Sequence, residues 1–347
     1  MSETHFPGIS HPYRPRRLRM TPNLRSLVRE NHLHMEDFIF PLFIRHGENI
    51  KNPIDSMPGM FQLSIDQLEE EISEITSLGI KSVILFGIPK EKDPIGEDNY
   101  SSEGIICQAI RKIKSLAPDL IVVTDVCLCE YTDHGHCGIL NQGPTGHNNP
   151  NLAEGYVLND ETLDILGKVS VVHAQAGADI IAPSGMIDGM VEAIRFFLDD
   201  ADFGHIPIMS YSVKYASAYY GPFRDAAEGA PKSGDRSTHQ MDPANVREAL
   251  KEAVIDQTEG ADFLIVKPAL AYLDVVRELR QTVGELPLVV YNVSGEYSMI
   301  KAAAERGWID EKRIVLETMM GMKRAGADII ISYHSKDIGR WLKEDRE

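Results

Sequence analysis

The stretch Leu120-Ile-Val-Val-Thr-Asp-Val-Cys-Leu-Cys129 is an apolar, β-branched run with cysteines at its end, and Glu130-Tyr-Thr-Asp-His-Gly-His-Cys-Gly138 follows it directly. A short apolar run of this kind is typical of a buried strand. Cys127 and Cys129 are two residues apart, so extended backbone projects both sulfurs to one side. The glycine-rich turn at 135–138 allows the chain to bring Cys137 back to them. The stretch therefore predicts a strand that ends in a metal site.

Three thiolates are suited to zinc, and a tetrahedral ion with three protein ligands keeps one position for water or substrate. His134 and His136 could supply a fourth ligand, which would make the zinc structural, and a cluster without metal is the remaining alternative. Cys107 stands alone in an expected helix, where a small core residue is the ordinary interpretation.

Short β-branched runs alternate with helical patterns on both sides of this stretch. Eight runs are expected as strands, namely residues 38–44, 82–87, 120–126, 179–183, 206–213, 262–266, 287–293 and 328–332. The helical patterns cover residues 64–78, 103–116, 161–176, 186–198, 243–258, 269–283, 296–305 and 311–325. Eight such units in 347 residues predict an α/β protein, a (β/α)8 TIM barrel.

A recurring Gly-Ala-Asp supports the barrel. It occupies residues 177–179, 260–262 and 326–328, each time where an expected helix gives way to a strand. Glycine at such a point can end the helix in a left-handed conformation. The alternative, an open doubly wound sheet, predicts a glycine-rich phosphate turn after the first strand, and none follows Ile44.

The composition limits the classes of partner. The net charge of −17 argues against nucleic acid. No apolar run reaches about 18 residues, so no membrane span is expected. The first residues lack the charged and apolar regions of a signal peptide, which favours a cytoplasmic protein.

The charge is unevenly distributed along the chain. Residues 1–32 contain six arginines and two glutamates, so this segment carries +4 and the remainder carries −21. We therefore expect an extended N-terminal arm, residues 1–35, that makes subunit contacts, and a catalytic barrel over residues 36–347. A disordered tail and a transit peptide are the alternatives for the arm.

Polar residues lie at the C-terminal ends of six consecutive expected strands, where a TIM barrel places its chemistry. They are Asp125 and Cys127, Ser184, Lys214, Lys267, Ser294 and Tyr333. A single lysine at a strand end ordinarily reaches solvent. Two lysines on adjacent strands disfavour each other's charge, and burial adds to this effect. One amine can then be neutral near pH 7 and form a Schiff base with a ketone, and Lys267, between Val266 and Pro268, is the stronger candidate.

The segment from Tyr219 to His239 is rich in Gly, Pro and Ser and is expected to be a mobile connector that acts as a lid. Its Arg224, Lys232 and Arg236 could clamp a substrate carboxylate. A solvated loop with incidental charges is the alternative.

With these residues the chain closely resembles the porphobilinogen synthase family, also called 5-aminolevulinic acid dehydratase. The resemblance runs from about Arg14 to Trp341 and rests on the cysteine stretch together with Arg-Pro-Arg-Arg-Leu-Arg, Phe-Pro-Leu-Phe-Ile, Tyr-Gly-Pro-Phe-Arg-Asp-Ala, Val-Lys-Pro-Ala and Val-Ser-Gly-Glu-Tyr. It implies a hydro-lyase that joins two molecules of 5-aminolevulinate into porphobilinogen with loss of two waters, an early step of tetrapyrrole and heme biosynthesis. It also implies an arm that wraps around a partner, usually in a homooctamer.

The resemblance implies a role for each matching residue. Lys267 and Lys214 would hold the first and the second substrate. The carboxylate of the first substrate would be bound by Ser294 and Tyr333, and that of the second by Arg224 and Ser237. The pocket near the amino groups would be lined by Asp125 and Ser184. Zinc would be bound by Cys127, Cys129 and Cys137, and an allosteric Mg2+ of many bacterial members by Glu252.

Two positions depart from the family pattern. Ser237 stands where relatives usually have Arg or Lys, so Lys232 or Arg236 could take over the second carboxylate contact, and His239 replaces a common tyrosine. A class I Schiff-base aldolase is the nearest alternative, but it would not need a three-cysteine site. A zinc-stapled scaffold protein, in which the lysines are incidental, is the alternative outside enzymes.

Overall fold

The structure, a computed structural model, describes residues 14–232 and 234–344. These residues form two compact units, which meet in sequence between His32 and Leu33. Of the expected arm and barrel, residues 1–13 and 345–347 lie outside the described part of the chain. Each unit is described by itself below.

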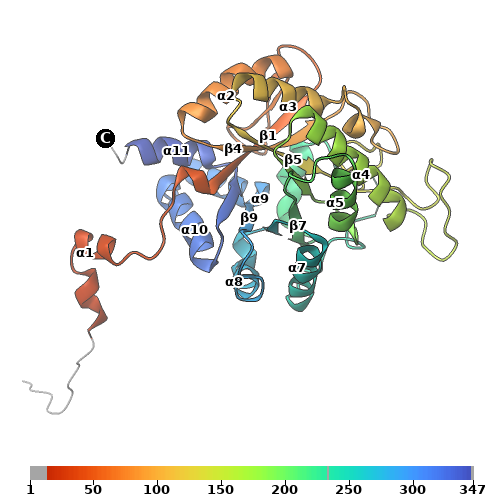
Figure 1. Ribbon diagram of the computed structural model, residues 1–347. Helices are drawn as coiled ribbons and strands as arrows, with labels where there is room; N and C mark the ends of the chain where they lie inside the picture. The colour runs from red at the N-terminus through yellow and green to blue at the C-terminus, as the bar shows by residue number, and fades with distance from the viewer. Residues whose placement is uncertain (1–13, 233, 345–347) are drawn as a thin grey trace, which may run out of the picture. The chain divides into compact units, whose positions relative to one another are not determined.

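Within residues 33–232 and 234–344, eight parallel strands form the wall of a barrel (Figure 1). They are β1 (Phe38–Arg45), β4 (Ser82–Ile88), β5 (Ile121–Val126), β6 (Ile180–Pro183), β7 (Met209–Lys214), β8 (Phe263–Lys267), β9 (Leu288–Asn292) and β10 (Ile329–Ser332). Their order is β6-β5-β4-β1-β10-β9-β8-β7. A parallel bridge between Ile181 and Ile208 joins the two ends of this order. The predicted TIM barrel is therefore confirmed, and each expected strand is found.

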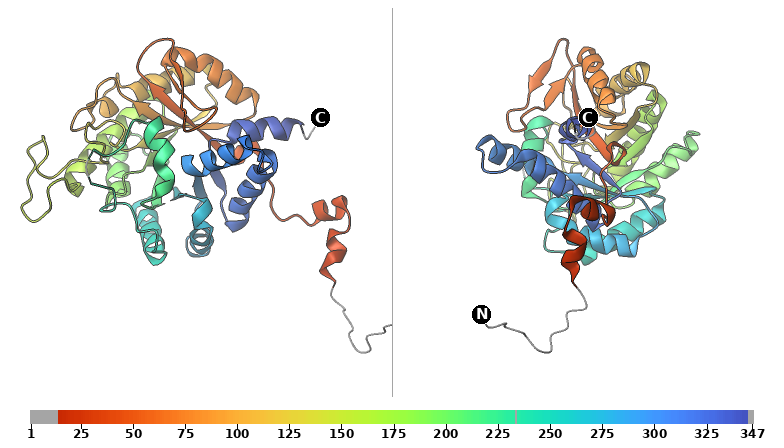
Figure 2. Two further views of the ribbon diagram at one scale, coloured as in Figure 1. Left: turned by 180° about the vertical axis from the view of Figure 1, so that it is seen from behind. Right: turned by 90° about the vertical axis from the view of Figure 1, so that its left-hand side faces the viewer.

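Helices surround the wall, as the views from behind and from the side show (Figure 2). They are α2 (Leu68–Ser77), α3 (Ile105–Leu116), α4 (Asn159–Ala176), α5 (Met190–Asp200), α7 (Arg247–Glu259), α8 (Leu273–Thr282), α9 (Ser294–Glu305), α10 (Glu311–Ala325) and α11 (Ser335–Glu344). Short 3-10 turns are η2 (Met35–Asp37), η3 (Ile65–Gln67), η4 (Glu97–Tyr100), η5 (Ala218–Tyr220) and η6 (Leu270–Tyr272). Every residue of β4, β7 and β9 is buried, because parallel strands are covered on both faces. Across the described ranges, no helix combines the length and apolarity needed to cross a membrane.

The three Gly-Ala-Asp repeats connect a helix to the next strand with the same backbone geometry and the same hydrogen bonds. Their glycines have φ of 105°, 104° and 131° at Gly177, Gly260 and Gly326, so each helix ends on backbone that favours glycine. Each aspartate then donates its N–H to a main-chain carbonyl beside it and accepts the N–H of the same residue on its carboxylate. The pairs are Asp179 with Val122 (2.9 and 2.7 Å), Asp262 with Ile208 (2.9 and 2.8 Å) and Asp328 with Leu288 (both 2.8 Å). These double contacts fix the register of neighbouring strands.

A small hairpin follows β1 and was not predicted. Its strands are β2 (Lys51–Pro53) and β3 (Phe61–Leu63), and they pair antiparallel. β3 also pairs in parallel with the end of β1, where Gln62 lies opposite Phe43. Because β10 pairs with β1 only at Phe38 and Ile39, β3 takes the place beside β1 at the C-terminal rim.

The unit of residues 14–32 contains η1 (Pro15–Arg19) and α1 (Pro22–Leu27). The Leu24 N–H donates to Thr21 Oγ1 at 3.2 Å, so Thr21 caps α1. The apolar side chains of Leu18, Met20 and Leu27 are exposed.

Candidate active site

Lys214 and Lys267 lie opposite each other as register partners at the ends of β7 and β8. Both are almost completely buried, at 4% and 5% exposure. The Lys214 ammonium donates to the main-chain carbonyl of Ser184, which follows β6. The Lys267 ammonium has no hydrogen-bond acceptor among the described residues and faces four aromatic rings instead. The distances from its Nζ to the ring centroids are 4.4 Å for Tyr291, 4.9 Å for Phe223, 5.2 Å for Tyr211 and 5.3 Å for Tyr220.

These surroundings give the two amines different proton affinities. Burial and the neighbouring Lys214 charge lower the pKa of Lys267 to about 7. Burial acts on Lys214 as well, but the three cysteines and Asp125 outweigh it, so the pKa of Lys214 is raised. Lys267 is therefore the amine that can be neutral near pH 7.

Asp125 and Ser184 meet beside the lysines. The Ser184 Oγ donates to Asp125 Oδ2 at 3.0 Å, and both side chains are buried. Burial and the nearby carboxylate of Glu130 raise the pKa of Asp125 to about 7, while the two lysines act in the opposite direction. The pair can hold a proton close to the two amines.

Ser294 and Tyr333 join the same rim. The hydroxyls of Tyr333 and Tyr291 lie 2.8 Å apart, which links Tyr333 to the ring nearest the Lys267 ammonium. Ser294 Oγ accepts the N–H of Phe223 at 2.9 Å. Phe223 belongs to α6 (Gly221–Ala226), which also carries Arg224. The segment expected as a connector thus begins with a short helix, since Pro222 favours a helix start.

Cys127, Cys129 and Cys137 form a buried cluster. Their Sγ atoms lie within 4.8 Å of one another, the Cys127–Cys129 distance is 3.4 Å, and all three thiols are free of disulfides. Sulfurs bound to one tetrahedral zinc at about 2.3 Å would lie about 3.8 Å apart, so the cluster fits such an ion. Hydrogen bonding to Cys127 and burial raise the pKa of Cys129 well above its usual range, and a bound cation would favour the thiolates. Asn99 Nδ2 donates to Cys127 O at 2.9 Å and holds the backbone there.

His134, one of the two histidines considered as a fourth ligand, has both ring nitrogens engaged away from the sulfurs. His134 Nε2 lies 3.2 Å from Pro94 O, and the N–H of His136 donates to His134 Nδ1 at 3.1 Å. Of the groups described, only the cysteines contribute ligand atoms to this cluster. The described side chains thus form a cluster of three sulfurs without a fourth protein ligand.

The connector beyond α6 covers the cysteine loop. Arg236 is buried and donates to Gly135 O at 2.9 Å and to Gly229 O at 2.6 Å. Gly135 has φ of 73°, and a Cβ there would lie 2.5 Å from Ala230 O, so the close approach requires glycine. The N–H of Lys232 donates to His134 O at 3.1 Å. Arg236 thus uses its guanidinium to join the connector to the loop.

Two expected site residues lie apart from the lysines. Ser237 has an exposed side chain, and Glu252 lies on α7, outside the barrel wall. Both line one cavity of about 170 Å³. Partial burial and the carboxylates of Asp256, Asp188 and Glu248 raise the pKa of Glu252 to about 7. The remaining predicted residues gather at the rim.

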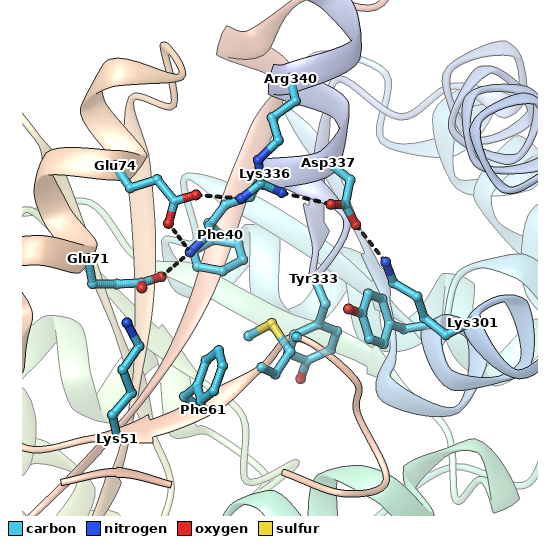
Figure 3. Close-up of a pocket in the computed structure, with 13 residues that line it drawn as sticks. Phe40, Lys51, Phe61, Glu71, Glu74, Lys301, Tyr333, Lys336, Asp337 and Arg340 are labelled. Atoms are coloured by element: carbon cyan, nitrogen blue, oxygen red, sulfur yellow. Dashed lines mark hydrogen bonds and ion pairs between the residues drawn. The ribbon is translucent and has the colours of Figure 1, made fainter. Parts of the chain in front are cut away.

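A larger cavity of about 300 Å³ adjoins the rim from outside the lysine site (Figure 3). Its wall contains Tyr333, the apolar side chains of Phe40, Met60 and Phe61, and charged residues of α2, α9 and α11. They are joined by ion pairs of Lys336 with Glu71 and Glu74, of Arg340 with Glu74 and Asp337, and of Lys301 with Asp337. The three carboxylates of this cavity are therefore all paired with cations, while Lys51, a further cation of the wall, pairs with Glu70 at 3.2 Å.

A second cluster with metal-ligand side chains lies nearby. It consists of Glu311, His334 and Asp337, and the His334 ring is fully buried. Lys301 Nζ lies 2.5 Å from Glu311 and 2.8 Å from Asp337. The chain itself therefore supplies the cation between these carboxylates, in contrast to the cysteine cluster.

The four rings around Lys267 and the Asn99 contact were not predicted. Tyr219-Tyr-Gly-Pro-Phe223 belongs to the segment expected as a connector, and Tyr211 and Tyr291 lie within the expected strands 206–213 and 287–293. One signal was present, because the inward alternation of β7 and β9 places aromatic residues next to strand ends that carry chemistry.

Comparisons with known proteins agree with one another. The family model described as delta-aminolevulinic acid dehydratase matches residues 12–341. The delta-aminolevulinic acid dehydratase of Halalkalibacterium halodurans is 57% identical over 333 residues, with 96% of this chain and 98% of the relative covered. That of Synechocystis is 54% identical, with 98% and 100% covered, and that of Bacillus subtilis is 54% identical, with 95% and 98% covered.

A solved structure gives the same match. The delta-aminolevulinic acid dehydratase (porphobilinogen synthase) of Toxoplasma gondii, in complex with the reaction product porphobilinogen, superposes with a TM-score of 0.91. It is 43% identical, and the match covers 96% of this chain and 92% of the other.

Proposed function

Because this chain belongs to the delta-aminolevulinic acid dehydratase family of enzymes, we propose that it condenses two molecules of 5-aminolevulinate through imines on Lys267 and Lys214. The product would be porphobilinogen, the compound bound in the Toxoplasma gondii relative. The reaction would serve tetrapyrrole and heme biosynthesis.

The observation that carries the proposal is the pairing of Lys214 with Lys267 in register, both almost completely buried. Each primary amine can condense with a substrate ketone, forming a C=N bond and releasing one water. Two such condensations account for the two waters of the overall reaction. New C–C and C–N bonds between the substrates then release both lysines as free amines.

The other rim residues bind and orient the substrates in this proposal. Ser294 and Tyr333 bind the carboxylate of the substrate on Lys267, and Arg224 binds that of the substrate on Lys214. Asp125 and Ser184 hold a proton near the amino groups, which is supported by their 3.0 Å hydrogen bond. Ser237 is the least supported member, because its side chain is exposed beside a different cavity.

We further propose that Cys127, Cys129 and Cys137 hold zinc with one position left for another ligand. The support is the fit of three buried sulfurs within 4.8 Å. When bound, zinc would act as a Lewis acid that polarises an oxygen of the substrate or of water.

The test is pyrrole formation from 5-aminolevulinate by the purified protein, with and without a zinc chelator. Activity that is lost with chelator and restored by zinc supports both the reaction and the metal. Borohydride reduction during turnover, followed by peptide mass spectrometry, should locate the imine on Lys267, with the exposed Lys168 as an unmodified control. No pyrrole and no trapped imine would contradict the proposal and favour the aldolase alternative.

The arm, residues 1–35, is proposed to dock on a second copy of the chain in a homooctamer. Its support is the exposure of Leu18, Met20 and Leu27 in a segment that carries positive charge on an otherwise acidic chain. Residues 1–13 lie outside the described residues. Deletion of residues 1–32 should lower the oligomer size in a sizing experiment, and an unchanged size would contradict the docking.

Glu252 is proposed to bind an allosteric Mg2+. The support is the group of carboxylates around it, whose mutual repulsion a divalent cation would relieve. Mg2+ should activate the wild type and leave Glu252→Gln unchanged. Equal activation of both proteins by Mg2+ would mean that Mg2+ acts at a site other than Glu252.

A further inference from the structure

The connector contacts the opposite side of the barrel rim through hydrogen bonds and an ion pair among Arg45, Gln62 and Glu228. The buried Gln62 donates its Nε2 to Ala226 O, at the end of α6, at 2.8 Å. Arg45, the last residue of β1, donates to Gln62 Oε1 at 2.5 Å and pairs with the Glu228 carboxylate at 3.4 Å. β3 brings Gln62 to this place because it pairs with the end of β1.

The backbone of Glu228 also indicates that its side-chain contacts hold the connector in one conformation. Glu228 has φ of 51°, in the left-handed region that a residue with a Cβ adopts only at a cost. Its main-chain carbonyl accepts a hydrogen bond from the Lys92 ammonium at 2.5 Å, and its carboxylate pairs with Arg45. The surrounding side chains stabilise a turn that the chain alone would not favour.

The short helix α6 depends on contacts at both of its ends. It has six residues, too few to be stable by its own hydrogen bonds. Near its start, Ser294 Oγ accepts the N–H of Phe223, and at its end Gln62 donates to Ala226 O. Arg224 lies between these two anchors, so they fix the backbone from which its side chain extends.

We propose that Gln62, held in place by Arg45, is a positioning residue that fixes Arg224 for the carboxylate of the second substrate. This inference rests on the proposed function, which gives Arg224 that role. Three of the four rings around Lys267 come from β7, β9 and η5 and do not depend on the end of α6. The imine of the first substrate should therefore be insensitive to Gln62.

The experiment compares Gln62→Leu with Gln108→Leu in the full-length holoenzyme. Gln108 is a matched control, because its Nε2 also donates to a main-chain carbonyl, that of Glu103 at 2.6 Å, on the outer helix α3. We expect Gln62→Leu to raise the KM for 5-aminolevulinate about tenfold, equivalent to about 1.4 kcal/mol, with kcat within about twofold. Gln108→Leu should leave both constants unchanged. Borohydride trapping at low substrate should label Lys267 to the same extent in both variants.

Arg45→Leu provides a second route to the answer if Gln62→Leu does not fold. It should raise KM in the same direction by a smaller factor, since Gln62 loses its support but remains present. The double variant should resemble Gln62→Leu, because coupled residues are not additive. If both single variants have the KM of the control and the imine on Lys267 is trapped normally, the positioning role of Gln62 is overturned while the proposed function stands. Absence of a trapped imine in the wild type would overturn the proposed function and this inference together.

Discussion

The surroundings of Lys267 and Lys214 differ although the two residues are register partners on neighbouring strands. Lys267 meets the faces of four rings, and Lys214 donates to the carbonyl of Ser184 and lies near the cysteines and Asp125. Aromatic faces attract a cation more weakly than a hydrogen-bond acceptor or an opposite charge does when both are buried. Burial and the Lys214 charge lower the pKa of Lys267, whereas the cysteines and Asp125 raise the pKa of Lys214.

The difference teaches that the strand end fixes where an amine lies, while the neighbouring strands and loops decide whether it is charged. The same parallel ladder delivers both side chains to one rim, so the ladder alone cannot distinguish their roles. The rings of Tyr291 and Tyr211, on β9 and β7, surround Lys267, and the cysteines of the loop after β5 lie near Lys214.

The largest effect is expected when the ring-enclosed amine is removed. Lys267→Ala should lower turnover by about a thousandfold or more, because the covalent step is lost while little packing changes. Pyrrole formation and circular dichroism measure the two quantities. Lys168→Ala, an exposed lysine of α4 paired with Asp164, is the control and should be fully active. Substantial turnover by Lys267→Ala would contradict the assignment of the imine.

Removal of one sulfur beside the other amine should have the next largest effect. Cys129→Ala should lose bound zinc and lower turnover by about a hundredfold, since a Lewis acid contributes several kcal/mol to the stabilisation of developing charge. Metal analysis and the pyrrole assay measure both. Cys107→Ala is the matched control, because Cys107 is buried on α3 and lies outside the cluster. A Cys129→Ala protein that keeps its metal would place the zinc elsewhere.

Much of the fold could be predicted because its signals are local. Most strands are short runs rich in apolar residues, and each Gly-Ala-Asp marks a junction within three residues. The hairpin of β2 and β3 escaped prediction since its strands have three residues each, too few to display a period. The double hydrogen bonds of Asp179, Asp262 and Asp328 also escaped prediction, because each joins the aspartate to a residue of a neighbouring strand.

The site could be predicted only in part for the same reason. The lysines and cysteines have short motifs, and the resemblance to a family supplied the other candidates. The contacts that distinguish Lys267 from Lys214 join residues far apart in sequence, such as Tyr291 from β9 and Phe223 from α6. Arg45 and Glu228 are 183 residues apart, and no pattern within either segment indicates the other.

A smaller effect, on proton affinity, should follow when Lys214 is replaced by methionine. The Lys214 charge lowers the pKa of Lys267, so its removal should raise that pKa and shift imine formation to more alkaline pH. In the wild type, trapping with borohydride should increase as the pH rises through about 7, where the Lys267 amine loses its proton. The pH profile of trapping at Lys267 measures the shift. An unchanged profile would show that burial alone sets the pKa of Lys267.

The smallest effect should follow from Tyr291→Phe, which keeps the ring over Lys267 and removes only the hydroxyl. The loss leaves the buried Tyr333 hydroxyl without its partner at 2.8 Å and should lower the free energy of unfolding by about 1 kcal/mol. The pH profile of trapping at Lys267 should stay where it is in the wild type, because the variant keeps the ring, whose centroid lies 4.4 Å from the ammonium. Tyr297→Phe, which loses a hydrogen bond to Pro58 O away from the lysines, should cause a similar loss of stability. A shift of the profile in Tyr291→Phe alone would mean that the hydroxyl pair, and not the rings, makes the Lys267 environment different from that of Lys214.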